Sequence, residues 1–428
     1  MTYLNGAAAK NQAHDPSIPY VLAFVGENAN GILSWWTSRV MDGLARRGVA
    51  HHLIDLCAED WNSQLIALLT NSRPSFCFSF QGFGMDIRTE AGNLWVQNQI
   101  PFVSYLGDNP CHAPSLHAAE GPGIYLLYGC ADFLETYQLY MNGRAYAALV
   151  RTGYPVNPAA GRIPWAQREH GAVFVKTGIN PAALRQAWEP LPAQTRTILA
   201  EAAEHLLGGA DVTVADSCAA AFQRAHVHWG NQREIFLFAC SSVDRYVRAV
   251  RAERMVRQLM RHDAFIVGDW PHLDRAGARA RFVSPVRASS LDDLYARSRI
   301  VVNTLPSIRR GVHERIMAGM LAKAAVISDT TPFLDQALAG CPSFHGLDID
   351  GAGFEDQLDH TLGAALADAS MPGKVEQSFQ VAERLFSMDA FVEEMFGTIA
   401  LEHHRRSLGG WVFPPASLAQ DTAVQSVN

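Results

Sequence analysis

The chain has 428 residues, of which 48% are hydrophobic and 18% charged, and it carries a formal net charge of -7 with a pI near 6.1. This composition excludes an intrinsically disordered protein, and the length exceeds what one ordinary core holds, so we expect two compact lobes. The negative charge gives none of the positive field that attracts phosphate backbones, so we expect no nucleic-acid partner.

The cysteines and the N-terminus favour a cytoplasmic protein. Seven cysteines are scattered without a C-x-x-C pair, and their odd number favours reduced thiols. Residues 1–19 lack the charged and apolar regions of a secretory signal and are expected to form a disordered leader. No run of about 18 apolar residues occurs, so no transmembrane segment is predicted.

In the first part of the chain, short apolar runs alternate with stretches of helical periodicity. The expected strands are residues 20–25, 51–56, 75–80, 101–106, 124–128 and 147–151, and the expected helices are 32–47 and 61–70. Such alternation is typical of a parallel sheet covered by helices. It predicts an N-terminal Rossmann-like lobe over residues 20–160, which ends in a loop rich in glycine and proline.

The rest of the chain predicts a helical connector and a second lobe. Residues 161–232 are assigned to the connector because most of them are rich in Ala, Leu and Glu at helical spacing. Further on, the expected strands are 234–239, 264–268, 281–284, 300–304 and 325–328, and the expected helices are 248–262, 291–297, 312–322 and those beyond 355. The second Rossmann-like lobe covers 233–405, and residues 406–428 form a loose tail. The predicted fold class is therefore α/β, with two Rossmann-like lobes facing a central cleft.

The segment NTLPSIRRGVHER, residues 303–315, carries the clearest chemical signal. In open α/β sheets, ligands bind where the carboxyl ends of strands lead into helices, and this segment joins an expected strand to an expected helix. Arg309, Arg310 and Arg315 suit phosphate oxygens, because the guanidinium fork makes two parallel contacts. The alternative is a solvated basic turn in which His313 caps the helix.

Several motifs follow one another in this half of the chain. They are a strand ending at Asn303, a Gly-x-His-x-Arg step at 311–315, a helix rich in small residues at 318–322 and a strand closing on Ser328-Asp329. This order resembles the C-terminal lobe of group 1 glycosyltransferases of the GT-B fold, especially the spore-maturation-protein-like branch. The resemblance covers roughly residues 234–345 and includes 238–242, Arg245 and Gly268-Asp269-Trp270.

The resemblance implies a glycosyltransferase that uses a nucleotide-sugar donor as co-substrate, with no metal and no other cofactor. The donor-binding residues that it implies are Ser241, Ser242, Arg245, Gly268, Trp270, Ser284, Pro285, Arg309, Arg310, Gly311, His313, Glu314 and Arg315. A UDP-sugar is the first expectation and a dTDP-sugar the second. The acceptor is expected to be a protein, such as flagellin or another surface protein, or a glycan.

Two positions depart from the pattern of the family. Ala318 stands where many group 1 enzymes have a ribose-binding Glu, and Lys323 stands where Gly is usual. These departures keep open a non-catalytic nucleotide-sugar-binding protein. A sugar-nucleotide epimerase on the same fold is the other alternative.

Polar residues that follow N-lobe strands are candidates for the catalytic base. They are Glu27 in GENANG, Asp108 in a DNP step that resembles the same branch, and His112. A carboxylate or imidazole at the cleft could deprotonate an acceptor hydroxyl. The alternatives are a turn capped by Asn30 and a plain Asp-Asn-Pro turn.

Overall fold

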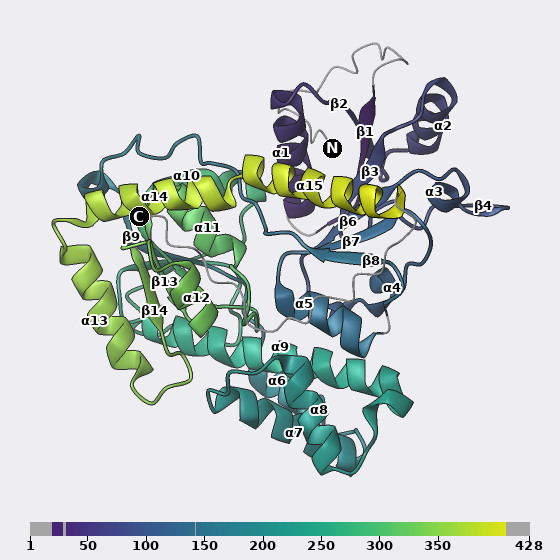
Figure 1. The fold of residues 1–428 in the computed structure, drawn as a ribbon. Coiled ribbons are helices and arrows are strands. Elements are labelled where there is room, and N and C mark those ends of the chain that lie inside the picture. Colours follow the sequence, from purple (N-terminus) through teal and green to yellow (C-terminus); the bar gives the residue numbers. More distant parts are fainter. Residues whose placement is uncertain (1–18, 29–30, 142, 408–428) are drawn as a thin grey trace.

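The computed structural model describes residues 19–28, 31–141 and 143–407 and contains two six-stranded parallel sheets (Figure 1). Nearly all of the expected leader and tail, residues 1–18 and 408–428, lie outside the described residues, and so does Asn30. Each sheet has helices on both faces, as parallel sheets require. The predicted fold class is confirmed.

The first sheet has the strand order β2-β1-β3-β6-β7-β8. Its strands are β1 (Tyr20–Val25), β2 (Ala50–Asp55), β3 (Phe76–Phe80), β6 (Phe102–Leu106), β7 (Ile124–Tyr128) and β8 (Tyr146–Leu149). The helices include α1 (Ile32–Arg46), α2 (Trp61–Asn71), α3 (Leu94–Gln97), α4 (Pro114–His117) and α5 (Ala131–Glu135), and β4 (Arg88–Thr89) pairs with β5 (Gly92–Asn93) in a small hairpin. All six expected strands of this lobe are confirmed to within two residues at each end.

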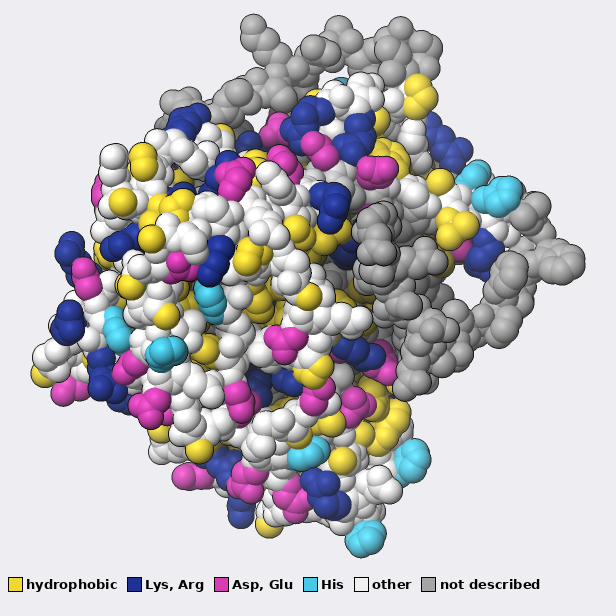
Figure 2. Space-filling model, turned by 60° about the vertical axis from the view of Figure 1, so that its left-hand side comes forward, with side chains coloured by type: hydrophobic (Ala, Val, Ile, Leu, Met, Phe, Trp, Pro, Cys, Tyr) yellow, Lys and Arg dark blue, Asp and Glu magenta, His cyan; other side chains and the backbone are white. Residues whose placement is uncertain are grey.

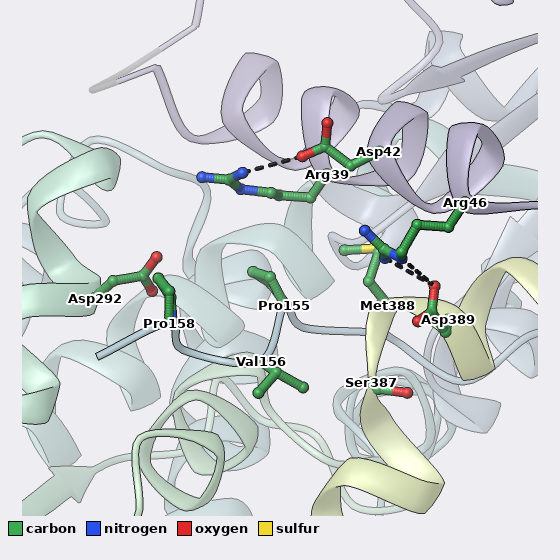
Figure 3. A pocket seen from close by; sticks show the side chains of 10 residues that line it. All are labelled: Arg39, Asp42, Arg46, Pro155, Val156, Pro158, Asp292, Ser387, Met388 and Asp389. Atoms are coloured by element: carbon green, nitrogen blue, oxygen red, sulfur yellow. Dashed lines mark hydrogen bonds and ion pairs between the residues drawn. The ribbon is translucent and has the colours of Figure 1, made fainter. Parts of the chain in front are cut away.

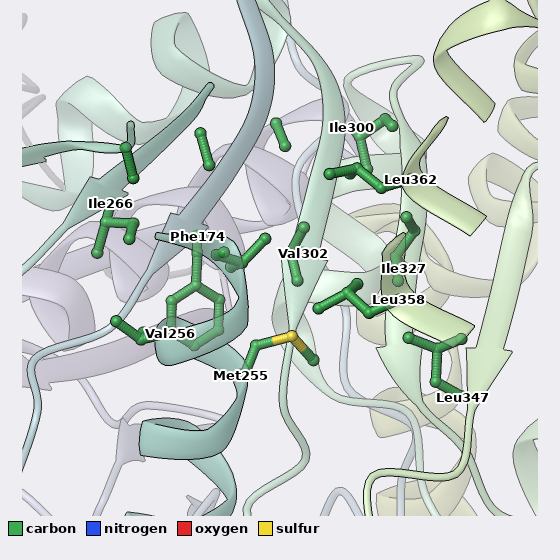
Figure 4. Packing of buried hydrophobic residues seen from close by; sticks show 14 of the residues in the cluster. Phe174, Met255, Val256, Ile266, Ile300, Val302, Ile327, Leu347, Leu358 and Leu362 are labelled. Carbon is green, nitrogen blue, oxygen red and sulfur yellow. The ribbon is translucent and has the colours of Figure 1, made fainter. Parts of the chain in front are cut away.

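The second sheet has the order β11-β10-β9-β12-β13-β14. Its strands are β9 (His170–Val175), β10 (Ala264–Val267), β11 (Arg281–Val283), β12 (Ser298–Asn303), β13 (Ala325–Asp329) and β14 (Phe344–Leu347). Helices α10 (Leu291–Ala296), α11 (Glu314–Leu321), α12 (Pro332–Ala337) and α13 (Phe354–Ala367) belong to this lobe. Figure 4 shows its core, which contains Phe174 of β9, Met255 of α9 (Arg233–Leu259) and Leu358 of α13.

Two expectations for the second lobe are wrong. Residues 234–239 do not form a strand but lie in the long helix α9 (Arg233–Leu259). Phe236 and Leu237 are buried while Ile235 and Phe238 are exposed, which is the spacing of a helix rather than the alternation of a strand. The strand that the sheet needs is instead β9, inside the range 161–232 that the sequence assigns to a helical connector.

The remainder of that range is helical, as expected. Helices α6 (Pro181–Gln186), α7 (Ala193–Leu207) and α8 (Val214–Arg224) follow β9 and pack on the N-terminal half of α9 around a core of their own. The C-terminal half of α9 lies in the core of the second lobe. One continuous helix therefore joins the helical layer to the second sheet (Figure 1).

The last two helices cross between the lobes. Helix α14 (Met371–Phe386) lies on the second lobe, and α15 (Met388–Ser407) runs back over the first sheet (Figure 1). Phe391, Val392 and Met395 of α15 are buried against β1, β3 and β6, so this helix belongs with the first lobe although the sequence places it in the second. The reason is burial, because the face of the first sheet beside α1 needs an apolar cover.

A cavity of about 260 Å³ marks this crossing (Figure 3). The backbone N–H of Tyr154 donates to the carbonyl of Phe386 at 2.8 Å, so the two connections between the lobes lie side by side. Arg46 of α1 pairs with Asp389 at 2.8 Å, and burial raises the pKa of Asp292 to about 6. The cavity therefore lies where the two chain segments cross between the lobes.

Phe391→Ala tests the place of α15. The Phe391 ring meets the Tyr105 ring edge-on, with 5.1 Å between centroids, and its removal leaves a cavity. We expect the free energy of unfolding to fall by about 3 kcal/mol in chemical denaturation. Leu401→Ala is the control on the same helix, because Leu401 is 68% exposed and its loss should change stability by less than about 0.5 kcal/mol. Equal effects of the two variants would contradict the packing.

Candidate active site between the lobes

Two adjoining cavities lie at the carboxyl ends of the second sheet. The first, of about 250 Å³, has mainly apolar walls, and we call it the apolar cavity; it is lined by Ile32, Tyr154, Val175, Val267, Gly268, Pro285, Val286, Ala288, Leu291, Tyr295, Glu314 and Ala318. The second, of about 430 Å³, is the charged cavity, lined by Asp108, His112, Ile179, Arg245, Arg248, Ala249 and Ala252. Lys176, Thr177 and Arg315 line both cavities, so these residues form the junction between them.

At Gly268, in the wall of the apolar cavity, the chain passes very close to the backbone of Lys176. This residue has φ of 137°, and a Cβ there would lie 2.2 Å from the carbonyl oxygen of Lys176. Only glycine fits such a conformation and such an approach. This close approach holds the carboxyl ends of β9 and β10 together. Pro285, which the sequence also predicts to contact the donor, lines the same cavity.

Arg315 reaches the junction from the first turn of α11. Its Nη1 lies 3.5 Å from Oδ1 of Asn303, the last residue of β12, and Asn303 in turn donates to Ser328 Oγ at 2.9 Å. Asn303 and Ser328 are fully buried. The motif residues Asn303 and Ser328 therefore position the guanidinium at the strand ends.

His313 does not face the cavities. It is buried, its Nδ1 accepts from the backbone N–H of Arg315 at 3.3 Å, and its Nε2 lies 2.8 Å from Glu314 Oε2. Burial lowers the pKa of His313 to about 4, so the ring is neutral and donates from Nε2. Burial acts to raise the pKa of Glu314, but His313 and Arg315 outweigh it and hold it at about 2. His313 thus caps α11 and orients an ionised carboxylate in the apolar cavity.

Lys176 is a site residue that the sequence did not reveal. It directly follows β9, and its Nζ lies 3.3 Å from Thr304 Oγ1. Burial, together with the positive charges of Arg315 and Arg248, lowers the pKa of Lys176 to about 7. A lysine in this state gains its proton readily when an anion arrives. The rule that ligands meet strand ends would have found it had β9 been recognised.

The first lobe contributes Asp108 to the charged cavity. The backbone of Gln81 has φ of 54°, and its side-chain amide donates to Asp108 Oδ2 at 2.8 Å. Desolvation by the cleft walls raises the pKa of Asp108, and the opposing effects of Arg248 and His112 do not cancel this. Asp108 is exposed toward the cavity. It is therefore a carboxylate with more than ordinary basicity, placed where a ligand can reach it.

His112 lines the same cavity, but both of its ring nitrogens are engaged. Nε2 lies 2.6 Å from Asp244 Oδ2 and Nδ1 lies 3.0 Å from Ser241 Oγ, both on α9. Burial acts to raise the pKa of Asp244, yet Arg248 and His112 outweigh it and keep the carboxylate ionised. His112 and Ser241, both predicted from the sequence, thus join the first lobe to α9.

Arg309 and Arg310 do not line either cavity. The buried carboxylate of Asp132, at the start of α5, accepts from the backbone N–H groups of both residues at 2.6 and 2.9 Å. It also pairs with Arg310 Nε at 2.7 Å, while Glu135 pairs with Arg310 Nη2. Arg309 pairs with Asp211. These arginines fasten the loop after β12 to the first lobe, because a buried carboxylate needs charged and hydrogen-bonding partners.

The other predicted residues fall outside the cavities. Trp270 is fully buried in the core and donates from its indole to the carbonyl of Lys176 at 2.8 Å. Glu27 and Ser284 are exposed, Ser242 is half-buried, and none of the three lines a cavity. Gly311 lies against α5, where an added Cβ would be 3.0 Å from Cys130 Cβ. The sequence motifs give the order of these residues along the chain but do not show whether each side chain faces the cleft or the core.

Some further observations concern possible metal sites, membrane spans, cysteines and surface charge. Among the residues that the structure describes, no group of three or more His, Cys, Asp and Glu side chains is arranged to hold a metal ion. No helix in the same part of the chain is long and apolar enough to cross a membrane. All seven cysteines are unpaired. On the face in Figure 2, basic and acidic side chains are interspersed rather than gathered into one basic field.

Comparison with known proteins supports the architecture. No family model matches the chain, and no curated protein matches it. Sucrose-phosphate synthase from Thermosynechococcus elongatus is similar over 90% of this chain and 99% of its own, with 9% identity and a TM-score of 0.50. HepE from Anabaena, in complex with UDP and glucose, is similar over 90% of this chain and 100% of its own, with 11% identity and a TM-score of 0.50. The fold is therefore GT-B.

Arg310→Ala tests whether Arg310 holds the loop after β12 to the first lobe rather than binding a ligand. It leaves the Asp132 carboxylate, 2% exposed, without its ion pair, so we expect the free energy of unfolding to fall by about 2 kcal/mol. UDP affinity should stay within about twofold. Arg297→Ala removes two exposed ion pairs, with Glu169 and Asp293, and should change stability by less than about 1 kcal/mol. If Arg310→Ala instead loses UDP affinity while its stability is unchanged, Arg310 is a donor-binding residue.

Proposed function

We propose that the protein is a metal-independent glycosyltransferase that transfers a sugar from a nucleotide donor to a hydroxyl of an acceptor. One observation carries the proposal: an apolar cavity and a charged cavity meet at two cations, Lys176 and Arg315, in a GT-B fold. A nucleotide sugar has the same order of parts, with an apolar base, an anionic diphosphate and a polar sugar. UDP is our first choice of nucleotide and dTDP the second.

The nucleoside fits the apolar cavity. The base would lie near Gly268 and Pro285, and the ribose hydroxyls would donate to Glu314, which is ionised at neutral pH. Many group 1 enzymes bind the ribose through a Glu at the position of Ala318, one turn later on α11. In this assignment, Glu314 binds the ribose instead. Lys323, the other departure from the family pattern, has φ of 56° and pairs with Glu376 at 2.7 Å, and it lines neither cavity.

The diphosphate fits the junction. As the bond between the anomeric carbon and the phosphate oxygen breaks, the leaving diphosphate gains negative charge, which Arg315 and Lys176 stabilise. Their positions are set before the donor arrives, by Asn303 and Thr304 respectively. Preorganised cations of this kind lower the barrier without reorganising during the reaction.

The acceptor fits the charged cavity, with Asp108 as the base. In a direct displacement, the Asp108 carboxylate takes the hydroxyl proton, the acceptor oxygen bonds to the anomeric carbon, and the bonding electrons leave with the nucleoside diphosphate. His112 positions this wall rather than acting as the base, because its nitrogens are bonded to α9. We propose a protein or a glycan as the acceptor and the cytoplasm as the compartment. By its motifs, the chain resembles the spore-maturation-protein-like branch of these enzymes.

A non-catalytic nucleotide-sugar-binding protein is the second candidate. The observation that favours it is the loss of a carboxylate at Ala318, on the wall of the apolar cavity. The two functions differ in one measurement, because an enzyme releases free UDP from a UDP-sugar in the presence of acceptor or water. An epimerase on the same fold would convert the sugar without releasing UDP.

Arg315→Ala tests the donor site. UDP binding by calorimetry should weaken by at least about 30-fold, since a charge-assisted pair with phosphate contributes about 2 kcal/mol or more. The melting temperature should hardly change, because the guanidinium makes only long polar contacts with the described residues, at 3.5 Å with Asn303 and 3.9 Å with Glu314. Native protein that binds neither UDP nor dTDP would refute the proposal.

Lys176 predicts a pH dependence of donor binding. Its pKa of about 7 means that the amine loses its proton as pH rises above 7, whereas bound diphosphate favours the charged form. UDP affinity should therefore fall by up to about 25-fold between pH 7.5 and 9, with proton uptake on binding. The phosphates of the nucleotide are already fully ionised in this range, because their last pKa is about 6.

Lys176→Met provides the control for that experiment. The variant has no titrating group at the junction, so its weaker UDP affinity should be flat over the same pH range. A native profile that is flat, or a variant profile as steep as the native one, would show that Lys176 does not meet the diphosphate.

A further inference from the structure

We propose that the charged cavity binds a second anionic group, a carboxylate or a phosphate, beyond the donor diphosphate, and that Arg245 and Arg248 of α9 hold it. This inference rests on the proposed function, because it takes Lys176 and Arg315 as the diphosphate ligands. The anionic group belongs either to the donor sugar or to the acceptor. The charge of the cavity and the partners of its arginines carry the argument.

The arginines of α9 recur at every third position, at 245, 248, 251, 254 and 257, and most of them meet a carboxylate. Arg251 pairs with Asp350 at 2.5 Å, Arg254 with Glu355 at 2.7 Å, and Arg257 with Glu253 at 2.5 Å. Arg245 is the exception: among the described residues, its exposed guanidinium has no hydrogen-bond or ion-pair partner. The chain supplies a carboxylate to each arginine that faces away from the cavity and none to this one.

Arg248 is only partly engaged. Its Nη1 lies 3.3 Å from Asp244 Oδ2, an oxygen that His112 Nε2 approaches more closely, at 2.6 Å. A guanidinium has five N–H donors in a fork that matches two oxygens at once, and most of those of Arg248 remain available. Residues three apart on a helix share a face, so Arg245 and Arg248 can contact one anion together.

The cations of the charged cavity outnumber its carboxylates. Lys176, Arg245, Arg248 and Arg315 line it, whereas Asp108 is its one acidic lining residue and Asp244 lies buried behind Arg248. A diphosphate at Lys176 and Arg315 leaves two arginines facing the place of the sugar and acceptor. A neutral sugar and a neutral hydroxyl acceptor give those arginines nothing to pair with. Burial lowers the pKa of Lys176, and the positive charges of Arg315 and Arg248 lower it further, so the cations of this cavity repel one another and a further anion would reduce that repulsion.

The donor and acceptor sources of the anion predict different binding results. Calorimetry on the full chain would compare UDP-glucuronate with UDP-glucose, and would separately titrate inorganic phosphate into protein saturated with UDP-glucose. A donor-side anion predicts that UDP-glucuronate binds at least about tenfold more tightly than UDP-glucose. An acceptor-side anion predicts saturable phosphate binding to the UDP-glucose complex. Either result supports the site, and the absence of both overturns it.

Arg245→Gln identifies the residue responsible. It should reduce the anionic preference, or the phosphate affinity, by at least about tenfold, and Arg245→Lys should restore part of it. Arg257→Gln, on the same helix but paired with Glu253, should leave both unchanged. If Arg245→Gln instead weakens UDP by the same factor, Arg245 is a diphosphate ligand and the inference is wrong. If native protein binds no UDP at all, the proposed function itself fails, which is a distinct result.

Discussion

The buried carboxylate of Asp132 is the constraint on which the site depends. It accepts from two consecutive backbone N–H groups and from the side chain of Arg310, so it fixes the path of the loop between β12 and α11. That path decides where α11 begins, and the start of α11 decides where Arg315 points. The carboxylate belongs to the first lobe and the loop to the second. Removing the carboxylate would therefore disturb the cleft from both sides, because the backbone N–H groups of Arg309 and Arg310 would lose their acceptor.

Basic residues in this protein divide between holding the lobes and meeting a ligand, and their partners distinguish the two tasks. Arg309 and Arg310 have carboxylates within 3 Å, whereas Lys176 has a hydroxyl at 3.3 Å, and Arg315 has an amide at 3.5 Å and a carboxylate only at 3.9 Å. Weakly satisfied cations in a partly desolvated cleft keep their attraction for an incoming anion. The strongly paired arginines attract an incoming anion less, because their carboxylate partners already neutralise their charge. A sequence shows the arginines but not this division.

The two-lobed fold could be predicted because strands such as Tyr20–Val25 and Ile124–Tyr128 are short apolar runs between clear turn signals. The run at 234–239 misled because its five consecutive apolar residues fit a strand and a buried helix equally well. Of the candidate site, Arg315 and Asp108 were expected because they follow predicted strands, whereas Gly268 and Pro285 were expected from the family resemblance. Lys176 was missed with its strand. The burial of Trp270 depends on tertiary packing, which no local pattern encodes.

Helix α9 extends over 27 residues, about 40 Å in length. Its first half belongs to the layer formed with α7 and α8, its last half to the core of the second lobe, and its middle to the wall of the charged cavity. A rigid rod of this kind lets the wall of the charged cavity vary independently of the apolar cavity. Related chains could therefore exchange or lengthen the α6–α8 layer, and so change what approaches the charged cavity, while the strand ends at the apolar cavity stay the same.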